Sequence, residues 1–277
     1  MKIKELVSKL NPVKVNYCGK ENIEVKNIAQ DSRNPKGTVF FAYKGESYNS
    51  NKDAENIYKS GMAEFIICEE DLGDNIAHAV IKNGRKLLAA AVSAFYNEPM
   101  KKYCSMAVTG TNGKTTSTYI MESIFHEAGM KTCRIGTTGI MIDDEFVEID
   151  NTTPSPELVY SSLARGLEIG CTALTMEVSS HALAQGRING AFFEIAVFTN
   201  LTGDHLDFHK NMENYFEAKA LLFTDTYSKH RVINVRNEYG KKLADRIKEN
   251  LITFNIFDNN ADIFPVKYTS TVYGIDA

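Results

Sequence analysis

The feature of this sequence that most constrains its fold is a glycine loop at residues 110–116, Gly-Thr-Asn-Gly-Lys-Thr-Thr. Residues 106–108 before the loop are apolar, which is typical of a buried strand. After the loop, apolar residues recur with helical spacing at positions 120, 121, 124, 125 and 128. A strand, a glycine loop that ends in Lys-Thr and a helix form the arrangement that holds the phosphates of a nucleoside triphosphate.

Each residue type in this loop has a physical reason for its place. Backbone N–H groups and the positive helix end hold phosphate oxygens, the lysine reaches the terminal phosphates, and a threonine hydroxyl binds Mg²⁺. Counted from Gly110, the loop is two residues shorter than the general G-x-x-x-x-G-K-[S/T] pattern. A glycine turn with a surface lysine is the alternative, and the flanking strand and helix disfavour it. The residues expected to bind the nucleotide are Gly110, Thr111, Asn112, Gly113, Lys114, Thr115 and Thr116.

The composition excludes several classes of protein. A chain of 277 residues is long enough for two domains, and 43% apolar residues is ordinary for a globular protein. The net charge of −4 and the lack of a dense basic run argue against nucleic-acid binding. The five cysteines are scattered without C-x-x-C spacing, which argues against disulfides and zinc. No long apolar run or signal-peptide core is present, so we expect a soluble, cytoplasmic protein without a membrane span.

The pattern of apolar runs predicts two domains of the α/β class. Apolar runs at 38–43 and 64–68 are typical of strands, and residues 52–60 and 85–95 of helices. A polar stretch around Pro99 follows, so we place a small N-terminal domain at residues 1–99 and a second domain at 100–277. In the second domain strands and helices alternate, which predicts a doubly wound, mostly parallel sheet. Its further strands are expected at 173–178, 195–199 and 231–235, and its further helices at 156–170 and 212–223.

Polar residues gather where the predicted strands of this sheet end. In an open parallel sheet, ligands bind beyond the carboxyl ends of the strands. Glu177 ends one strand beside the glycine loop, where a carboxylate is a natural Mg²⁺ ligand. A solvated strand end is the alternative for Glu177. His205 lies just past another strand, and taken alone it is more typical of a structural or helix-capping residue than of a metal ligand.

Lys219 stands on the apolar stripe of the predicted helix 212–223, three residues after Phe216 and four after Tyr215. An inward lysine must extend its amine to the surface, form an ion pair or change its charge state. Periodicity alone favours a lysine whose stem is buried and whose amine reaches water. A modified lysine that carries a carboxylate is the other interpretation, and it would supply an oxygen for a metal ion beside the phosphates.

Two further segments are compatible with substrate binding, although neither decides the matter alone. Residues 151–156, which include Thr152 and Thr153, precede a helix N-terminus that suits a carboxylate or phosphate. Plain helix capping is the alternative. Arg187, after Gln185, could hold a substrate anion with two hydrogen bonds, although a lone arginine is more often a solvated surface residue.

Several of these motifs together resemble the Mur ligases, which add amino acids to the peptidoglycan precursor. The resemblance covers nearly the whole chain, and it is strongest to the members that add the third residue, usually a diamino acid. It rests on residues 109–116 and on four other segments: 31–33, 151–156, 177–183 and 204–207.

The resemblance also implies roles for individual residues. Ser32 matches a residue that contacts the UDP-sugar, and the residues that match those holding the muramoyl-dipeptide are Thr152, Thr153, Ser179, Gln185 and Arg187. Two magnesium ions are implied, the first bound by Thr115 and Glu177 and the second by His205. Lys219 matches a lysine that is carbamylated in this family and contributes to the metal site. The residues implied in catalysis are Lys114, His205 and Lys219.

The implied reaction is ATP-dependent amide-bond formation. The D-Glu carboxylate of UDP-N-acetylmuramoyl-L-alanyl-D-glutamate attacks the γ-phosphate of ATP, and the amine of the diamino acid then attacks the acyl phosphate. Positioning and charge neutralisation supply most of the catalysis in the first step. The resemblance further implies a monomer, and a C-terminal amino-acid-binding domain that is absent from residues 1–277. We therefore expect little or no turnover from this chain alone.

Two other functions remain open from the sequence. A folylpolyglutamate-synthase-type ligase would share the glycine loop and the carbamylated lysine, but residues 31–33 argue against it. A non-catalytic module that binds a UDP-linked precursor or a nucleotide would share the loop without the chemistry. Binding of a UDP-sugar separates the first alternative from the Mur ligases, and tight ligand binding by a native product of 277 residues would favour the second.

Overall fold

The computed structural model describes residues 1–45, 48–272 and 274–276, and they form two compact units. Unit 1 consists of Met1–Pro99 together with two later segments, Ser155–Ser161 and Gln185–Ala191. Unit 2 consists of Met100–Pro154, Ser162–Ala184 and Phe192–Ala277. The division is therefore not a single cut in the sequence, because two short segments from the second half of the chain pack with the first 99 residues.

Unit 1 is built on a five-stranded sheet in the order β1-β5-β4-β3-β2. Strands β2 to β5 pair in parallel and β1 pairs antiparallel with β5. The strands are β1 (Lys14–Asn16), β2 (Ile28–Ala29), β3 (Gly37–Phe41), β4 (Ala63–Cys68) and β5 (His78–Val80), and the helices are α1 (Ile3–Ser8), α2 (Asn51–Lys59) and α3 (Gly84–Phe95). Phe40 and Ile66 pack with Ala54 and Ile57 of α2 in a buried cluster, so α2 covers one face of the sheet.

Unit 2 is built on an eight-stranded sheet in the order β13-β12-β11-β6-β10-β7-β8-β9. The six strands from β13 to β7 run parallel, and β8 and β9 extend the sheet as an antiparallel hairpin. The strands are β6 (Cys104–Thr109), β7 (Thr132–Gly136), β8 (Gly139–Ile142), β9 (Glu145–Val147), β10 (Ala173–Glu177), β11 (Phe193–Phe198), β12 (Ser228–Asn234) and β13 (Leu251–Phe254). The predicted α/β class and mostly parallel sheet are confirmed, while the hairpin is an addition to the prediction.

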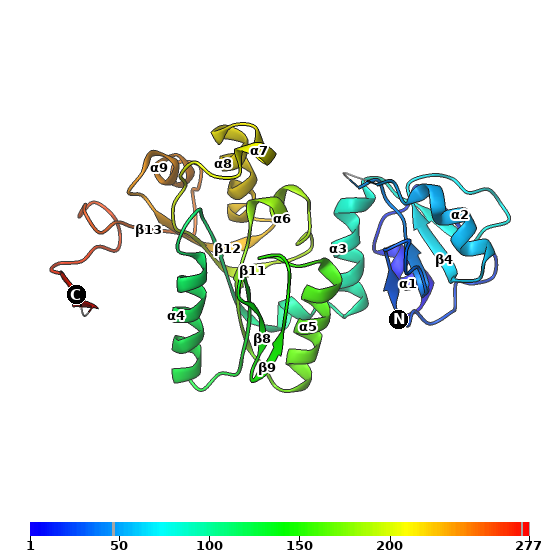
Figure 1. Cartoon of the computed structure of the whole chain (residues 1–277), viewed down its shortest axis with the longest axis horizontal. Helices are drawn as coiled ribbons and strands as arrows, with labels where there is room; N and C mark the ends of the chain where they lie inside the picture. The colour runs from blue at the N-terminus through cyan, green and yellow to red at the C-terminus, as the bar shows by residue number, and fades with distance from the viewer. Residues whose placement is uncertain (46–47, 273, 277) are drawn as a thin grey trace. The chain divides into compact units, whose positions relative to one another are not determined.

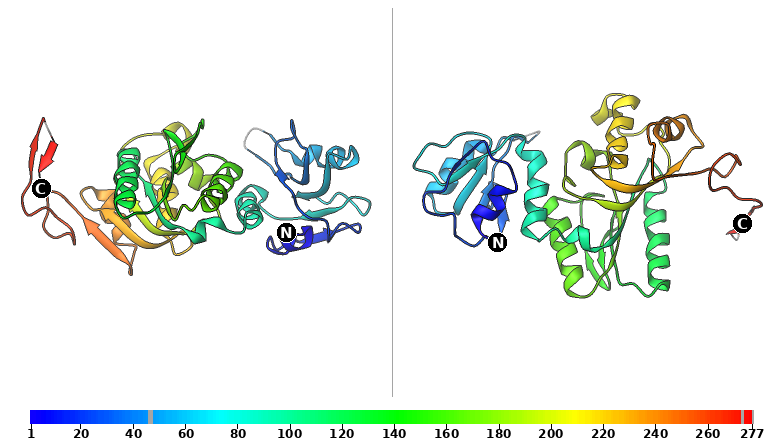
Figure 2. Two further views of the ribbon diagram at one scale, coloured as in Figure 1. Left: turned by 90° about the horizontal axis from the view of Figure 1, so that it is seen from below. Right: turned by 180° about the vertical axis from the view of Figure 1, so that it is seen from behind.

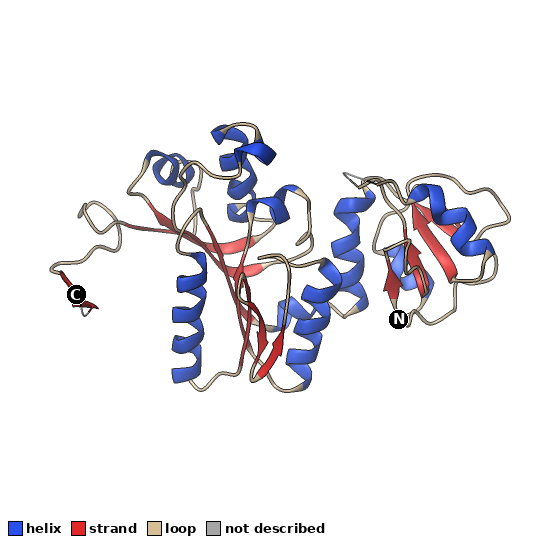
Figure 3. Ribbon diagram, viewed as in Figure 1, coloured by secondary structure: helices blue, strands red, loops and turns tan. Residues whose placement is uncertain are grey.

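Helices cover both faces of this sheet (Figures 1 and 2). Helix α4, which follows the glycine loop, lies on one face, and the part of α5 that belongs to unit 2 lies on the other. The remaining elements of this half of the chain are α4 (Lys114–Glu127), α5 (Pro156–Glu168), α6 (Ser180–Ala184), α7 (Leu206–His209), α8 (Met212–Ala220), α9 (Glu238–Ala244), the 3-10 turns η1 (Pro99–Lys102) and η2 (Leu221–Phe223), and the hairpin of β14 (Thr269–Thr271) and β15 (Gly274–Asp276) (Figure 3). None of the helices among the described residues is long and apolar enough to cross a membrane.

The buried face of α4 is not its apolar face. Ile120 and Ile124 are 56% and 53% exposed, whereas Thr118 and Glu122 point inward and are buried. Glu122 accepts a hydrogen bond from Arg134 Nε of the neighbouring strand at 2.8 Å, so an ion pair rather than an apolar contact holds the inward side. Helical spacing therefore predicted the helix correctly, but it did not predict which side faces the sheet.

Candidate functional site

Three neighbouring strands of unit 2 bring most of the predicted site residues to one end of the sheet. Strand β6 lies between β10 and β11, and all three run parallel. Their carboxyl ends therefore lie side by side (Figure 1). The glycine loop leaves β6, Glu177 ends β10, and Thr199 and Asn200 follow β11.

The glycine loop is held in place by the residues that follow β11. Thr111 N donates to Asn200 O at 3.0 Å, Asn112 N donates to Asn200 Oδ1 at 2.9 Å, and Thr199 Oγ1 donates to Asn112 O at 2.7 Å. Gly110 has a φ of +150°, and a Cβ there would lie 2.0 Å from Thr199 Oγ1. Only glycine fits this position, because both the backbone conformation and the close approach exclude a side chain.

The loop ends at the start of α4, where the first N–H groups have no partner within the helix and the helix dipole is positive. Lys114 Nζ donates to Gly110 O and Thr111 O, both at 3.0 Å, so the amine lies over the loop. Burial lowers the pKa of Lys114, and the charges of Glu177 and Asp204 act in the opposite direction. A cation over a loop of N–H donors suits a polyphosphate.

Glu177 is a fully buried carboxylate that meets hydroxyl and amide donors (0% exposed). Thr115 Oγ1 donates to its Oε2 at 3.0 Å, and Thr137 donates to it twice, from N at 2.9 Å and from Oγ1 at 3.1 Å. A Cβ at Gly136 would lie 2.2 Å from Glu177 Oε1, so glycine is needed there to admit the carboxylate. The alternative of a solvated strand end is thereby excluded.

Three of the predicted substrate residues lie at the end of the same strand. Thr153 Oγ1 donates to Glu177 O at 3.0 Å and accepts from Ser179 N at 3.0 Å. Thr152 Oγ1 lies 3.1 Å from Thr137 Oγ1, which also contacts Glu177. Thr152, Thr153 and Ser179 therefore gather around Glu177 within unit 2, at the end of β10.

Lys219 is buried beside the glycine loop and is 2% exposed, so the interpretation that periodicity alone favoured, an amine that reaches water, is wrong. Its Nζ donates to Gly110 O at 2.9 Å, lies 3.5 Å from Thr109 Oγ1 and stands 4.7 Å over the ring of Tyr215. Burial, together with the charge of Lys114, lowers its pKa to about 7. The amine therefore does not reach water, and at neutral pH a substantial fraction of it is uncharged and nucleophilic.

His205 lies at the edge of this group rather than within it. It occupies the N-cap position of α7 with a φ of +52°, and its side chain forms no capping hydrogen bond. Its Nε2 lies 3.4 Å from Asp204 Oδ2, and its ring packs edge-on against His181 with the ring centroids 4.8 Å apart. The ring centroid of Tyr215 is 6.2 Å away. His205 therefore stands at the capping position without capping the helix through its side chain. Its role in metal binding stays a prediction.

The other predicted substrate residues line a cavity of about 820 Å³ in unit 1. Ser32, Gln185 and Arg187 share this cavity with Tyr43 and Arg85. The remaining lining residues are Gln30, Asp31, Arg33, Gly45, Tyr48 and Ser50. The predicted substrate residues thus form two sets, one in each unit.

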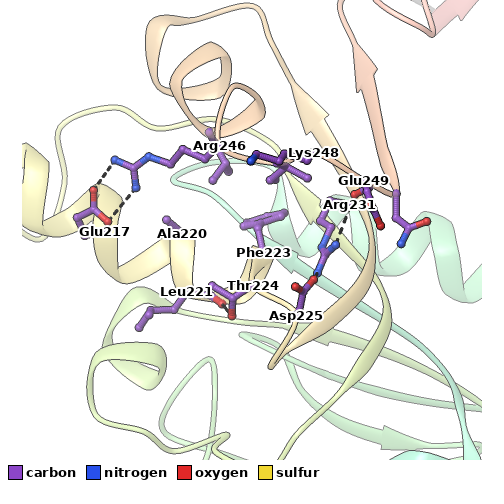
Figure 4. A pocket seen from close by; sticks show the side chains of 13 residues that line it. Glu217, Ala220, Leu221, Phe223, Thr224, Asp225, Arg231, Arg246, Lys248 and Glu249 are labelled. Carbon is purple, nitrogen blue, oxygen red and sulfur yellow. Dashed lines mark hydrogen bonds and ion pairs between the residues drawn. The ribbon is translucent and has the colours of Figure 1, made fainter.

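A second cavity, of about 580 Å³, lies in unit 2 at the amino ends of β12 and β13 (Figure 4). Arg246 donates two hydrogen bonds to Glu217, at 2.7 and 3.0 Å, and Arg231 pairs with Asp225 at 2.6 Å (Figure 4). Arg231 Nε is buried without a hydrogen-bond partner. This cavity contains none of the predicted site residues.

The oxygen donors at the end of β10 fit one magnesium ion that is held jointly with a nucleotide. No group of three or more His, Cys, Asp or Glu side chains in the described part of the chain is placed to hold a metal ion. Mg²⁺ is usually bound by one or two carboxylates together with phosphates and water. Glu177 and Thr115 satisfy that requirement, and Mg²⁺ there would neutralise phosphate charge. A second ion at His205 would need the oxygens of a modified Lys219, because an amine that donates to Gly110 O is no ligand.

Several residues at these sites were missed from the sequence. Thr137, which binds Glu177, follows β7, and Thr199 and Asn200, which hold the loop, follow β11. The signal for all three was their place directly after a strand of the parallel sheet. In the unit 1 cavity Tyr43 has the same signal, because it follows β3 of a parallel sheet, whereas Arg85 in the first turn of α3 has none.

The fold and the loop define a class of α/β proteins in which a glycine loop follows a central parallel strand. The sequence pattern of the Mur ligase middle domain matches residues 108–275, and the chain belongs to the Mur ligase family. The resemblance noted from the sequence is thereby confirmed.

Two curated relatives carry the name UDP-N-acetylmuramoyl-L-alanyl-D-glutamate–2,6-diaminopimelate ligase. The relative from Clostridium tetani is 38% identical over 92% of this chain and 53% of its own length. The relative from Bacillus cereus is 37% identical over 99% of this chain and 57% of its own length. A solved structure with the same name superimposes with a TM-score of 0.81 at 26% identity, over 99% of this chain and 56% of that one. The chain spans about half the length of the relatives it matches.

Proposed function

We propose that this chain carries the nucleotide-binding and precursor-binding parts of an ATP-dependent ligase. The ligase joins a diamino acid to UDP-N-acetylmuramoyl-L-alanyl-D-glutamate in peptidoglycan precursor synthesis. The names of the curated relatives support this substrate pair. The observation that carries the proposal is the buried Glu177 carboxylate, which accepts from Thr115 of the glycine loop at 3.0 Å.

In the first step of this reaction the chain positions the phosphates and neutralises their charge. Lys114 and the N–H groups at the start of α4 hold the β- and γ-phosphates of ATP. Thr115 and Glu177 would hold a Mg²⁺ ion, which would neutralise charge on the phosphate that is transferred. The D-Glu side-chain carboxylate of the precursor then attacks the γ-phosphorus, ADP leaves, and an acyl phosphate forms on the precursor.

In the second step the amine of the diamino acid attacks the acyl-phosphate carbonyl and phosphate leaves. We propose that Lys219 in its carbamylated form, together with His205, holds a second Mg²⁺ during catalysis. A buried amine with a pKa of about 7 supports this modification, because the uncharged amine is the form that reacts with CO₂.

We assign the binding of the UDP-sugar to the cavity of unit 1 and that of ATP to unit 2, following the predicted division at residues 1–99 and 100–277. Ser32, Gln185 and Arg187 are the proposed precursor-binding residues of the cavity. Thr152, Thr153 and Ser179 are those beside Glu177. ATP and UDP-linked sugars are cytoplasmic metabolites, so the proposal places the enzyme in the cytoplasm. We further propose that it is a monomer.

The related folylpolyglutamate synthases offer only a likeness of fold. The structure of the enzyme from Mycobacterium tuberculosis superimposes with a TM-score of 0.53 at 15% identity. Titration with UDP-N-acetylmuramoyl-L-alanyl-D-glutamate separates the two functions. The proposal expects binding of this precursor, and a chain that binds a folate instead would contradict it.

The metal role of Glu177 is tested by nucleotide titration of E177Q. Calorimetry with a non-hydrolysable ATP analogue, with and without Mg²⁺, measures how much the ion adds to the affinity. We expect Mg²⁺ to strengthen binding to the wild-type chain and to add little in E177Q, because the amide is a poor ligand. E127Q is the matched control, since Glu127 is exposed on α4. A normal Mg²⁺ effect in E177Q would refute this assignment.

A further inference from the structure

Arg85 lines the unit 1 cavity from the first turn of α3 and is not among the residues to which a role has been given so far. The segment that carries Gln185 and Arg187 packs directly on the same helix. Asn189 Nδ2 donates to Lys86 O at 3.0 Å, and a Cβ on Gly190 would lie 3.4 Å from Ala90 Cα. Helix α3 therefore fixes Arg187 and Arg85 on the same cavity.

Hydrogen bonds to Glu69 hold the start of α3, which carries Arg85, in place. Glu69 accepts from Gly84 N at 2.7 Å and from Lys44 N at 2.7 Å, and its Oε2 also accepts from Asn51 Nδ2 at 3.1 Å. One carboxylate thus joins the first turn of α3 to the chain that leaves β3. A Cβ on Gly84 would lie 2.8 Å from Tyr43 Cβ, so the helix and this chain are in close contact.

The lining of the cavity is predominantly positive. Three guanidinium groups, those of Arg33, Arg85 and Arg187, line it together with one carboxylate, that of Asp31, within the part of the chain that the structure describes. Arg33 donates to Asp31 at 2.7 to 3.1 Å and lowers the pKa of that carboxyl to about 2. The negative charge of Asp31 is therefore offset by Arg33. Burial and the charge of Glu157 raise the pKa of the Tyr43 hydroxyl, and the charges of Arg85 and Arg187 both oppose the rise. Both guanidinium groups therefore act near the same point of the cavity.

This arrangement suits a ligand that carries concentrated negative charge. A guanidinium group binds phosphate oxygens with two parallel hydrogen bonds, and it stays charged at all physiological pH values. Of the groups of the proposed precursor, the diphosphate has the highest density of charge. We infer that Arg85 is a further ligand-binding residue of the unit 1 cavity and that it binds the diphosphate of a UDP-linked ligand. The inference rests on the proposed function of this cavity.

The test compares a ligand that has the diphosphate with one that lacks it. Calorimetric titration of the 277-residue chain with UDP and with uridine is carried out for the wild type, R85A, R85K and K82A. We expect R85A to weaken UDP binding by about 10- to 100-fold, the loss for a charged hydrogen-bonding partner, and uridine binding by less than about twofold. R85K keeps the charge without the two-pronged geometry and is expected to lie between R85A and the wild type. K82A removes an exposed charge close by in sequence and outside the cavity lining, and it should bind like the wild type.

The possible outcomes separate the inference from the proposal on which it rests. A wild-type chain that binds UDP, with R85A binding it equally well, would overturn the inference and leave the proposed function intact. Equal losses of UDP and uridine in R85A would also overturn it, because Arg85 would then shape the cavity rather than bind phosphate. A wild-type chain that binds neither UDP nor the full precursor would contradict the proposed function itself, and the inference with it. Thermal unfolding of each variant shows whether it is folded.

Discussion

Charged side chains at the two ends of the eight-stranded sheet differ in whether they form ion pairs. At the amino ends of β12 and β13, the guanidinium groups of Arg231 and Arg246 meet carboxylates within 3 Å (Figure 4). At the carboxyl ends of β6 and β10, Glu177, Lys114 and Lys219 are buried or half-buried, and they meet hydroxyl, amide and carbonyl groups instead of opposite charges. Among the described residues, none of these three groups has an ion-pair partner within 4 Å.

The difference in ion pairing indicates the position of the ligand site more clearly than the two cavities do. A charged group that already forms an ion pair attracts a ligand of opposite charge only weakly, because its partner offsets its charge. Buried charges without ionic partners cost stability, and proteins retain such groups mainly where a ligand or metal will supply the missing charge. Substitutions at the two ends of the sheet should therefore differ in their effect on nucleotide binding and on stability.

The largest effect is expected for K114M at the carboxyl end. The change removes the cation over the loop, and nucleotide affinity should fall by about 10- to 100-fold, as for the loss of a charged hydrogen-bond donor. Titration with a non-hydrolysable ATP analogue measures the loss. K102M, which removes an exposed lysine, should bind normally. Unchanged affinity in K114M would show that the carboxyl end is not the phosphate site.

The second prediction concerns the pH dependence of stability. The pKa of Lys219 is lowered to about 7 in the folded chain, so between about pH 7 and the usual lysine range the folded state binds fewer protons than the unfolded state. Stability must therefore rise with pH across this window and be lowest below it. The wild type should gain roughly 2 kcal/mol over K219M between about pH 7.5 and about pH 9.

Urea denaturation in CO₂-free buffer, followed by circular dichroism, measures this gain. Carbon dioxide must be excluded because a carbamate would change the charge of the group. K102M serves again as the control, since an exposed lysine should give the same pH profile as the wild type. If the wild type and K219M show parallel profiles, Lys219 is not a desolvated amine and the contrast between the two ends weakens.

The third prediction concerns Tyr215, which connects the loop to Lys219. Its hydroxyl lies 3.3 Å from Thr111 Oγ1, and its ring lies under the Lys219 amine. Y215F should lower the free energy of unfolding by about 0.5–1.5 kcal/mol, the contribution of one hydrogen bond, and Y215L should lower it further because the ring is lost. Y239F should have no effect, because the structure gives the Tyr239 hydroxyl no hydrogen bond. Equal stability of Y215F and the wild type would show that the Tyr215 hydroxyl does not stabilise the loop.

The smallest effect is expected at the amino end. Glu217 and Arg246 are both partly exposed, with 47% and 41% of their side chains accessible, so water screens their attraction. E217Q should therefore change the free energy of unfolding by less than about 1 kcal/mol, and less still at high salt, while nucleotide affinity stays the same. A large loss of nucleotide binding in E217Q would abolish the distinction between the two ends.

The elements that carry the phosphate site were predictable because their signals are local. The run before Gly110 and the apolar stretches that became β10, β11 and β12 are continuous and bounded by polar residues, and each formed a strand close to its expected limits. The place of Lys219 on an apolar stripe predicted an inward stem, but periodicity alone favoured an amine that reaches water, and the structure buries the amine instead. The roles of Lys219 and His205 in metal binding stay predictions.

The rest depended on contacts far apart in the sequence. Strand β1 has three residues and exists because Lys14 pairs with Val80, and β2 has only two residues. No periodic pattern is visible over such lengths. The two later segments of unit 1 were assigned by position to the second domain, because nothing in their own residues signals that they pack elsewhere.

The β8–β9 hairpin, in contrast, has a local signal in the sequence. Two short runs with apolar residues flank Asp143-Asp144, and Asp143 has a φ of +52°. Two-residue hairpin loops favour residues that tolerate this left-handed conformation, and aspartate is one of them. The pair of aspartates therefore predicts a tight turn, and with it the antiparallel edge of the sheet.

The close approach of Gly110 to Thr199 limits how this chain can change. An added methyl group at position 110 would overlap the Thr199 hydroxyl, and that hydroxyl in turn fixes the loop through Asn112. The Thr199 side chain therefore bars every other residue from position 110. Replacement of Thr199 in the same clone would not be enough, because the added Cβ would still lie 3.0 Å from Asn200 O and the backbone conformation still requires glycine.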